Sequence, residues 1–257
     1  AGWKKKLLWG LPLAAAFIVG GLYFIGFFSG DTSFGELLED TPAFVVPQVD
    51  WSYTRADILA MTHLDGQPVE TLADADQATR DRVAALLLEL VFRELFEFGL
   101  IQTDANFANF LYCDDSARLG LLDFGATRSL PDGVTDGYRR LLAAAVREDR
   151  QAMAESARGI GYFKEAIHAD QREAVIDLFL QVTEPARMHG RYDFGSSDLP
   201  QRIRDAGLAL SFECGYWHTP PADVLFIHRK LAGLYLLAAR LRARVDVNSI
   251  LQRFVRL

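Results

Sequence analysis

The sequence predicts a mostly α-helical protein with a small β component, and three observations support this prediction. From Pro131 onward, apolar residues recur at helical spacing between glycine, proline and polar breaks. Earlier segments contain short β-rich runs separated by turn residues. An uncharged segment near the N-terminus predicts a membrane helix. The helices expected in the C-terminal half are 134–148, 149–158, 164–184, 197–212, 221–244 and 246–255.

The N-terminal segment combines a basic flank with a long apolar run. Lys4, Lys5 and Lys6 precede Leu7–Phe28, 22 residues without a charge, which as a helix can cross a hydrocarbon core of about 30 Å. We therefore assign residues 1–30 to one transmembrane helix. The length of the run disfavours a cleaved signal peptide, and a buried core helix remains an alternative. By the positive-inside rule the lysines face the cytoplasm or its equivalent, and the rest of the chain faces the far side.

Beyond the span, residues 31–43 predict a polar, acidic linker with one helical turn, followed by a single domain at 44–257. Two β-rich runs at 44–54 and 58–64 predict a hairpin, in which Pro47 restricts the first run to an edge or a strand start.

The clearest helix is predicted at 77–98, where apolar residues fall on one face and Gly99 follows as a natural stop. Ion pairs four residues apart are expected for Glu89–Arg93 and Arg93–Glu97. This helix leads directly into the stretch that carries the chemistry.

That stretch runs from Gln102 to Gly125. Asn109 follows Asp104 by five positions, as in the protein-kinase catalytic loop, and Asp123 begins an Asp-Phe-Gly triplet. Apolar runs on either side of a polar turn at 114–116 predict a hairpin that returns Asp123 to Asn109. In protein kinases the loop Asp handles the substrate hydroxyl, while the Asn and the second Asp hold magnesium ions. A chance array of turn-forming residues is the alternative.

In the kinase interpretation, the run at 58–64 leads to the hinge. Backbone groups around Met61, His63 and Leu64 would then meet the adenine of the nucleotide. An exposed hairpin without a ligand is the alternative.

The motifs QTDANFANFLY and LLDFGATRSL resemble the UbiB (ADCK) family of atypical kinases, in its coenzyme-Q-biosynthesis branch. LLLELVFRELFEFGLIQTD and HRKLAGLYLL extend the resemblance from about Phe34 to the C-terminus. It implies a kinase-like C-lobe in which Asp104 is the catalytic acid and Gln102 and Thr103 position the loop. It further implies that Asn109 and Asp123 coordinate Mg2+ bridging the phosphates of ATP or ADP.

The resemblance also implies partners and a location. Membrane lipid is expected as a partner, together with ubiquinone-pathway proteins or an isoprenoid lipid. The expected location is the bacterial or mitochondrial inner membrane, as a single-pass protein.

The chain departs from the family pattern upstream of the hinge. The nucleotide-covering loop, the strand lysine and the Lys-x-Gly-Gln helix are not found, and Lys4 to Lys6 are the only lysines before the hinge. Loss of these groups should weaken phosphate binding. The start at Ala1 suggests a fragment, a processed chain or an engineered one. Three hypotheses remain open: a membrane-tethered atypical kinase or ATPase, a catalytically impaired pseudokinase scaffold, and a truncated remnant of such an enzyme.

Composition excludes several other classes of function. The whole chain has a net charge of −7. Residues 1–30 carry three lysines and no acids, so the rest of the chain has a net charge of −10. This balance argues against nucleic-acid binding, which needs a basic face. Cys113 and Cys214 have no ligand-like spacing, and the five histidines form no H-x-x-x-H pattern, so neither a disulfide framework nor a zinc site is expected.

Overall fold

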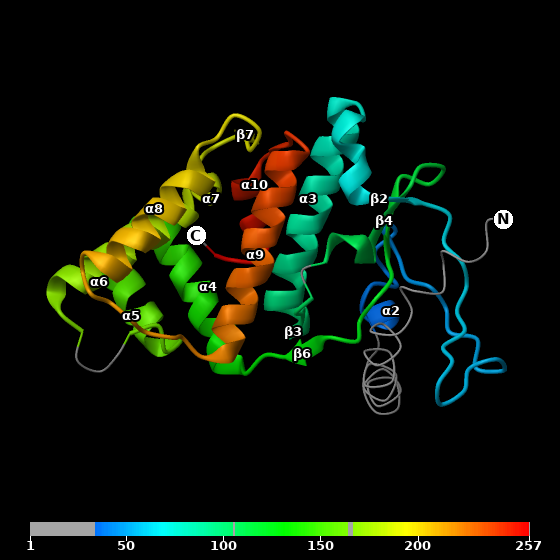
Figure 1. The fold of residues 1–257 in the computed structure, drawn as a ribbon, viewed down its shortest axis with the longest axis horizontal. Helices are drawn as coiled ribbons and strands as arrows, with labels where there is room; N and C mark the ends of the chain where they lie inside the picture. The colour runs from blue at the N-terminus through cyan, green and yellow to red at the C-terminus, as the bar shows by residue number, and fades with distance from the viewer. Residues whose placement is uncertain (1–33, 105, 164–166, 257) are drawn as a thin grey trace, which may run out of the picture. The chain divides into compact units, whose positions relative to one another are not determined.

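The structure is a computed structural model that describes residues 34–104, 106–163 and 167–256. Helices dominate these residues and the sheets are small, which confirms the predicted fold class at that level (Figure 1). The predicted span at 7–28 lies outside the described residues. Within the described part of the chain, no helix combines the length and apolar character needed to cross a membrane.

The chain divides into two compact units. Among the described residues, unit 1 comprises 34–69 and 106–127, and unit 2 comprises 70–104 and 128–256. Each unit is therefore assembled from segments that are separated in the sequence.

Unit 1 is built on a four-stranded sheet with the order β1-β5-β4-β2. Strands β4 and β5 form the predicted hairpin, with Phe110 opposite Leu121. Strand β1 runs parallel to β5, and β2 runs antiparallel to β4. The bounds are α2 Phe34–Leu37, β1 Phe44–Val45, β2 Gln67–Pro68, the 3-10 turn Phe107–Asn109, β4 Phe110–Cys113 and β5 Arg118–Leu121. The short helix α2 is the helical turn expected in the linker.

The hairpin predicted for 44–64 forms in an irregular way, because antiparallel bridges join Val49 to Met61 and Arg55 to Ile58 across the predicted turn, without two regular strands. Only Phe44–Val45 forms a strand, and its partner is the distant strand β5. Pro47 has no N–H to extend a ladder, and the intervening side chains are largely exposed, so little apolar burial supports a longer strand pair.

Unit 2 is almost entirely helical. Helix α3 (Gln77–Arg93) begins at Asp76, whose carboxylate accepts the Thr79 N–H at 2.9 Å. It continues into a π-helical turn at Glu94–Phe98 that ends at Gly99, where φ is 62°. Two of the remaining elements begin on the last residue of a unit 1 segment, the 3-10 helix Val69–Asp74 and β6 Thr127–Ser129. The others are β3 Leu100–Gln102, α4 Asp132–Val146, α5 Arg150–Gly159, α6 Ala169–Val182, α7 Glu184–Arg187, β7 Tyr192–Asp193, α8 Leu199–Phe212, α9 Ala222–Arg240, β8 Arg244–Val245 and α10 Val247–Leu251.

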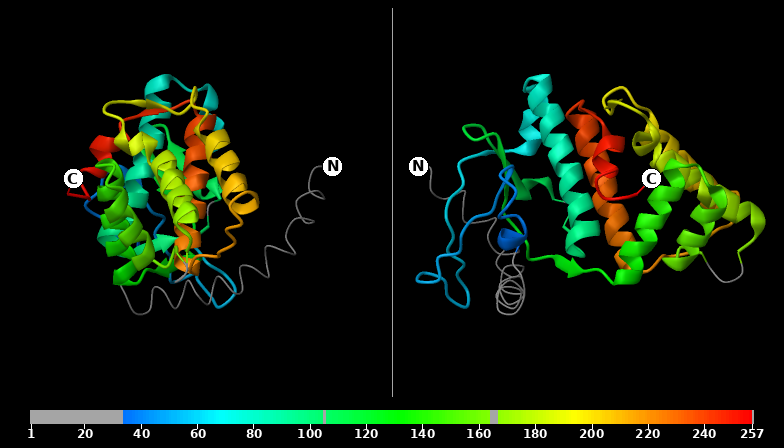
Figure 2. Two further views of the ribbon diagram at one scale, coloured as in Figure 1. Left: turned by 90° about the vertical axis from the view of Figure 1, so that its left-hand side faces the viewer. Right: turned by 180° about the vertical axis from the view of Figure 1, so that it is seen from behind.

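The core of unit 2 lies among its long helices. Helices α3 and α9 lie side by side in both the front and the rear view (Figures 1 and 2). The buried side chains include Ile101 of β3, Tyr138 of α4 and Ile227 of α9, so the core extends up to the strand that precedes Asp104. The last predicted helix, 246–255, ends early at Leu251, since the following residues form turns.

The predicted ion pairs are partly rearranged. Arg93 and Glu97 form the expected bridge at 2.7 Å. Glu89 pairs with Arg253 at 2.9 Å, which connects α3 to the C-terminal residues. Long-range packing thus supplies a partner that local spacing does not predict.

Candidate functional site

The β4–β5 hairpin of unit 1 brings Asn109 and Asp123 to the same end of the sheet. Asn109 closes a 3-10 turn that begins at Asn106, whose side chain accepts the Ala108 N–H at 3.1 Å. The backbone oxygen of Asn109 accepts the N–H of Leu122 at 3.0 Å. Because Leu122 immediately precedes Asp123, this bond holds the two loops together.

Asp123 has a defined side-chain orientation. Its Oδ1 accepts the N–H of Gly125 at 2.7 Å, which forms a tight turn on the carboxylate. Residue 123 is exposed, while the neighbouring Phe124 is buried with 5% exposure. The carboxylate is therefore held by its own loop and presented to solvent.

Asn109 and Asp123 offer oxygen donors, and amide and carboxylate oxygens are the ligands that Mg2+ prefers. The residues present thus fit the predicted cofactor. Within the part of the chain that the structure describes, no group of three or more His, Cys, Asp or Glu side chains could hold a metal. A site built on Asn109 and Asp123 would need oxygens from the nucleotide phosphates or from water.

Asp104 lies in unit 2, two residues beyond the end of β3. Asp104 and Thr103 are half-buried, and Gln102 is buried with 4% exposure. The predicted catalytic residues are thus divided between the two units. The convergence of Asp104 with Asn109 and Asp123 stays a prediction.

Unit 2 contains a buried ion pair that is not predicted from the sequence. Nζ of Lys230 on α9 donates to Oε2 of Glu94, and the two residues are 4% and 2% exposed. The backbone N–H of Gln102 bonds to the same carboxylate and opposes the rise in the pKa of Glu94 that burial causes. Burial also lowers the pKa of Lys230. The sequence signal for this pair is the position of Lys230, which directly precedes the apolar stretch LAGLYLL.

The predicted hinge residues lie in the irregular segment before β2. Met61 is 39% exposed, His63 is exposed, and Leu64 is half-buried with its Cδ1 close to Gly120. A Cβ on Gly120 would stand 3.0 Å from that atom, so glycine permits the approach. Adenine binding by Met61, His63 and Leu64 stays a prediction.

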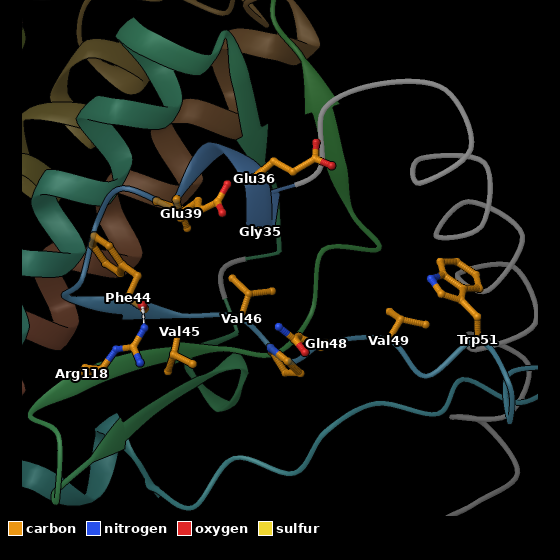
Figure 3. A pocket seen from close by; sticks show the side chains of 12 residues that line it. Gly35, Glu36, Glu39, Phe44, Val45, Val46, Gln48, Val49, Trp51 and Arg118 are labelled. Atoms are coloured by element: carbon orange, nitrogen blue, oxygen red, sulfur yellow. Dashed lines mark hydrogen bonds between the residues drawn. The ribbon is translucent and has the colours of Figure 1, made fainter.

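A separate cavity of about 540 Å3 lies in unit 1, beside α2 and β1 (Figure 3). Its described lining includes Phe44, Val46, Trp51 and Arg118, and none of the predicted nucleotide-binding residues. The Arg118 guanidinium donates to the backbone oxygen of Phe44. This bond ties β5 to β1 at the edge of the cavity.

The two cysteines are free. Cys113 is buried in β4, and burial raises the pKa of its thiol. A reactive thiol needs a lowered pKa. Cys113 is therefore a packing residue of β4 and not a reactive thiol.

Comparison with known proteins identifies the family to which the chain belongs. Residues 30–157 match the model of the ABC1 atypical kinase-like domain. The chain is 35% identical over 220 residues to the atypical kinase COQ8, mitochondrial, of Saccharomyces cerevisiae. This chain belongs to the ABC1 (UbiB/COQ8) family of atypical kinases. The family resemblance drawn from the motifs is therefore confirmed.

Other relatives show the extent of the match. Identity to COQ8B, mitochondrial, of Rattus norvegicus is 34% over 86% of this chain. Identity to the probable protein kinase UbiB of Cellvibrio japonicus is 26% over 53% of the chain. The alignments cover 43% of the Saccharomyces protein and 41% of the Rattus protein, so the chain spans about two fifths of the length of these relatives.

A solved structure has a similar fold. It is described as the complex structure of Rv3197-erythromycin from Mycobacterium tuberculosis, and it superposes with a TM-score of 0.66 over 94% of this chain and 57% of that one. The sequence identity is 17%. At this level, the likeness concerns the fold alone.

Proposed function

We propose that this chain forms the metal- and phosphate-binding part of an atypical kinase or ATPase that supports ubiquinone (coenzyme Q) biosynthesis. The observation that supports it best is the joined pair of loops carrying Asn109 and Asp123. In an ABC1-family chain, these loops present an amide and an oriented carboxylate from the same end of one hairpin.

Each residue has a proposed task. Asn109 and Asp123 would hold Mg2+ together with ATP or ADP, and Gly125 fixes the orientation of Asp123. When bound, the metal would supply positive charge to offset the charge that develops on the transferred phosphoryl group. Asp104 accepts the proton of the attacking hydroxyl or water, and Gln102 positions the segment that carries Asp104. Met61, His63 and Leu64 form the hinge that meets the adenine.

A binding measurement tests this proposal. Melting temperature is recorded for the 257-residue protein with ATP alone and with Mg-ATP. Ligand at a hundredfold excess over its dissociation constant stabilises the protein by about 2.7 kcal/mol, so a Mg-dependent rise of several degrees is expected. Asp123→Asn should abolish the rise. Asp115→Asn, an exposed carboxylate in the turn of the same hairpin, should retain it.

The absence of a Mg-ATP shift in the unaltered protein would contradict the proposal. Binding without turnover would support the second candidate, a pseudokinase scaffold.

The pathway needs a separate test. The chain is expressed in Saccharomyces cerevisiae lacking its own COQ8, and ubiquinone is quantified by mass spectrometry. Restored ubiquinone that is lost again in Asp123→Asn would support the proposed pathway and the need for this site. Failure to restore ubiquinone, with Mg-ATP binding intact, would leave the nucleotide function and remove the pathway assignment. The membrane tether at 7–28, with membrane lipid as partner, is part of the proposal and is tested by carbonate extraction of membranes.

A further inference from the structure

We infer that the buried pair Glu94–Lys230 is a positioning device that fixes the end of β3 and thereby the segment that carries Asp104. The inference rests on the proposed function for its catalytic consequence, and on geometry within unit 2 for the rest.

Glu94 is the first residue of the π-helical turn, and its backbone oxygen accepts the N–H of Gly99. π-turns occur frequently at functional sites. In this turn the Glu94 side chain is buried, whereas the neighbouring acid Glu97 is exposed.

The Glu94 carboxylate accepts the backbone N–H of Gln102, the last residue of β3. The next residues are Thr103 and Asp104. The carboxylate therefore holds the strand only two positions before the proposed catalytic acid.

Lys230 supplies the charge that pairs with Glu94. A buried carboxylate is costly unless it is paired, and removal of one partner from a buried pair is strongly destabilising. Lys230 stands on α9, which packs against α3. It neutralises Glu94 in place, so the two longest helices of the described chain jointly fix one strand end.

Two double variants separate positioning from stability. Glu94→Met with Lys230→Met replaces the pair by apolar side chains of similar length, which often restores stability, but it removes the acceptor for Gln102. Glu94→Gln with Lys230→Met retains an oxygen acceptor at the cost of a buried amide. If the pair has only a structural role, turnover should fall in whichever variant has the lower melting temperature. If the pair positions β3, turnover should fall in the double Met variant, which lacks an acceptor for the Gln102 N–H, and persist in the Gln–Met variant, which keeps one.

The primary measurement is amide hydrogen exchange at Gln102, Thr103 and Asp104 in the 257-residue protein. In the double Met variant the Gln102 amide should exchange at least tenfold faster than in the unaltered protein, and in the Gln–Met variant its exchange rate should be unchanged. Unchanged protection in the double Met variant would overturn the inference.

Mg-ATP turnover is the second measurement. The double Met variant should show a kcat at least tenfold lower with an unchanged KM for ATP, because Asn109 and Asp123 are not altered. Turnover equal to that of the unaltered protein, despite lost protection, would also overturn the inference. If the unaltered protein has no turnover, the proposed function fails on its own, and the exchange result alone decides whether the pair fixes β3.

Discussion

Acid should destabilise unit 2 through His228, and the size of the effect follows from its surroundings. His228 lies on α9 with its Nε2 2.9 Å from the Tyr138 hydroxyl oxygen, and its ring is 5.5 Å from that of Tyr162. Burial lowers the pKa of His228 from 6.5 to about 4. Burial also raises the pKa of Tyr138, so neither ring carries a charge near neutral pH.

The sign of the effect is set by which state takes up the proton first. Below pH 6.5 the unfolded chain protonates this histidine, while the folded protein resists protonation until about pH 4. The free energy of unfolding therefore falls as the pH falls through this window. At about 1.36 kcal/mol per unit of pKa difference, the loss reaches about 2 kcal/mol by pH 5 and about 3 kcal/mol in all.

The assay is urea unfolding followed by far-UV circular dichroism at pH 7.5 and at pH 5, for the unaltered protein and for His228→Gln. Glutamine keeps a polar partner for Tyr138 and does not titrate. The unaltered protein should lose about 2 kcal/mol more than His228→Gln between the two pH values. His189→Gln, at an exposed histidine of the same unit, should behave like the unaltered protein. An equal acid loss in His228→Gln and the unaltered protein would refute the reasoning.

Two further predictions concern helix packing and capping. A Cβ on Gly137 of α4 would stand 2.1 Å from Cγ2 of Ile160, so Gly137→Ala should lower the free energy of unfolding by about 1–3 kcal/mol. Gly207 lies in the interior of α8, and a Cβ there would have no atom within 4 Å. Gly207→Ala should therefore raise the free energy of unfolding by up to about 1 kcal/mol. A loss at Gly207 or no loss at Gly137 would contradict this. Asp149 accepts the Ala152 N–H at 3.0 Å as the N-terminal cap of α5. Asp149→Ala should therefore lower the free energy of unfolding by about 1 kcal/mol in thermal or urea unfolding, and Asp149→Asn, which keeps a capping oxygen, should lower it much less. Equal losses in the two variants would exclude capping as the cause.

The helices could be predicted from the sequence because their signals are local. The segment 77–98 has apolar spacing, a capping Asp76 and a terminal Gly99, and the structure places its helical elements at 77–93 and 94–98. The change to a π-turn at Glu94 could not be predicted, because the interaction with Lys230 that fixes Glu94 spans 136 positions. Local spacing along the sequence does not identify the partner of either residue.

The candidate site divides in the same way. The hairpin that joins Asn109 to Asp123 was predicted because both strands and their turn lie within one short stretch. The pairing of Phe44–Val45 was not predicted, because its partner strand β5 lies far along the chain and local β propensity does not identify it. The Gln102–Glu94 contact was missed for a related reason, since it depends on how β3 returns past the preceding turn.

The parallel pairing of β1 with β5 has a consequence for how the protein is made. The Arg118 bond to Phe44 spans 74 positions, and the segment between them contains helix α3 of the other unit. On the ribosome, the sheet of unit 1 cannot close before residue 121 has emerged, and α3 cannot bury its apolar face against α9 until residue 240 has been made. The two units are therefore interleaved in synthesis, and long-range closure rather than helix formation should limit the rate at which the native chain is reached.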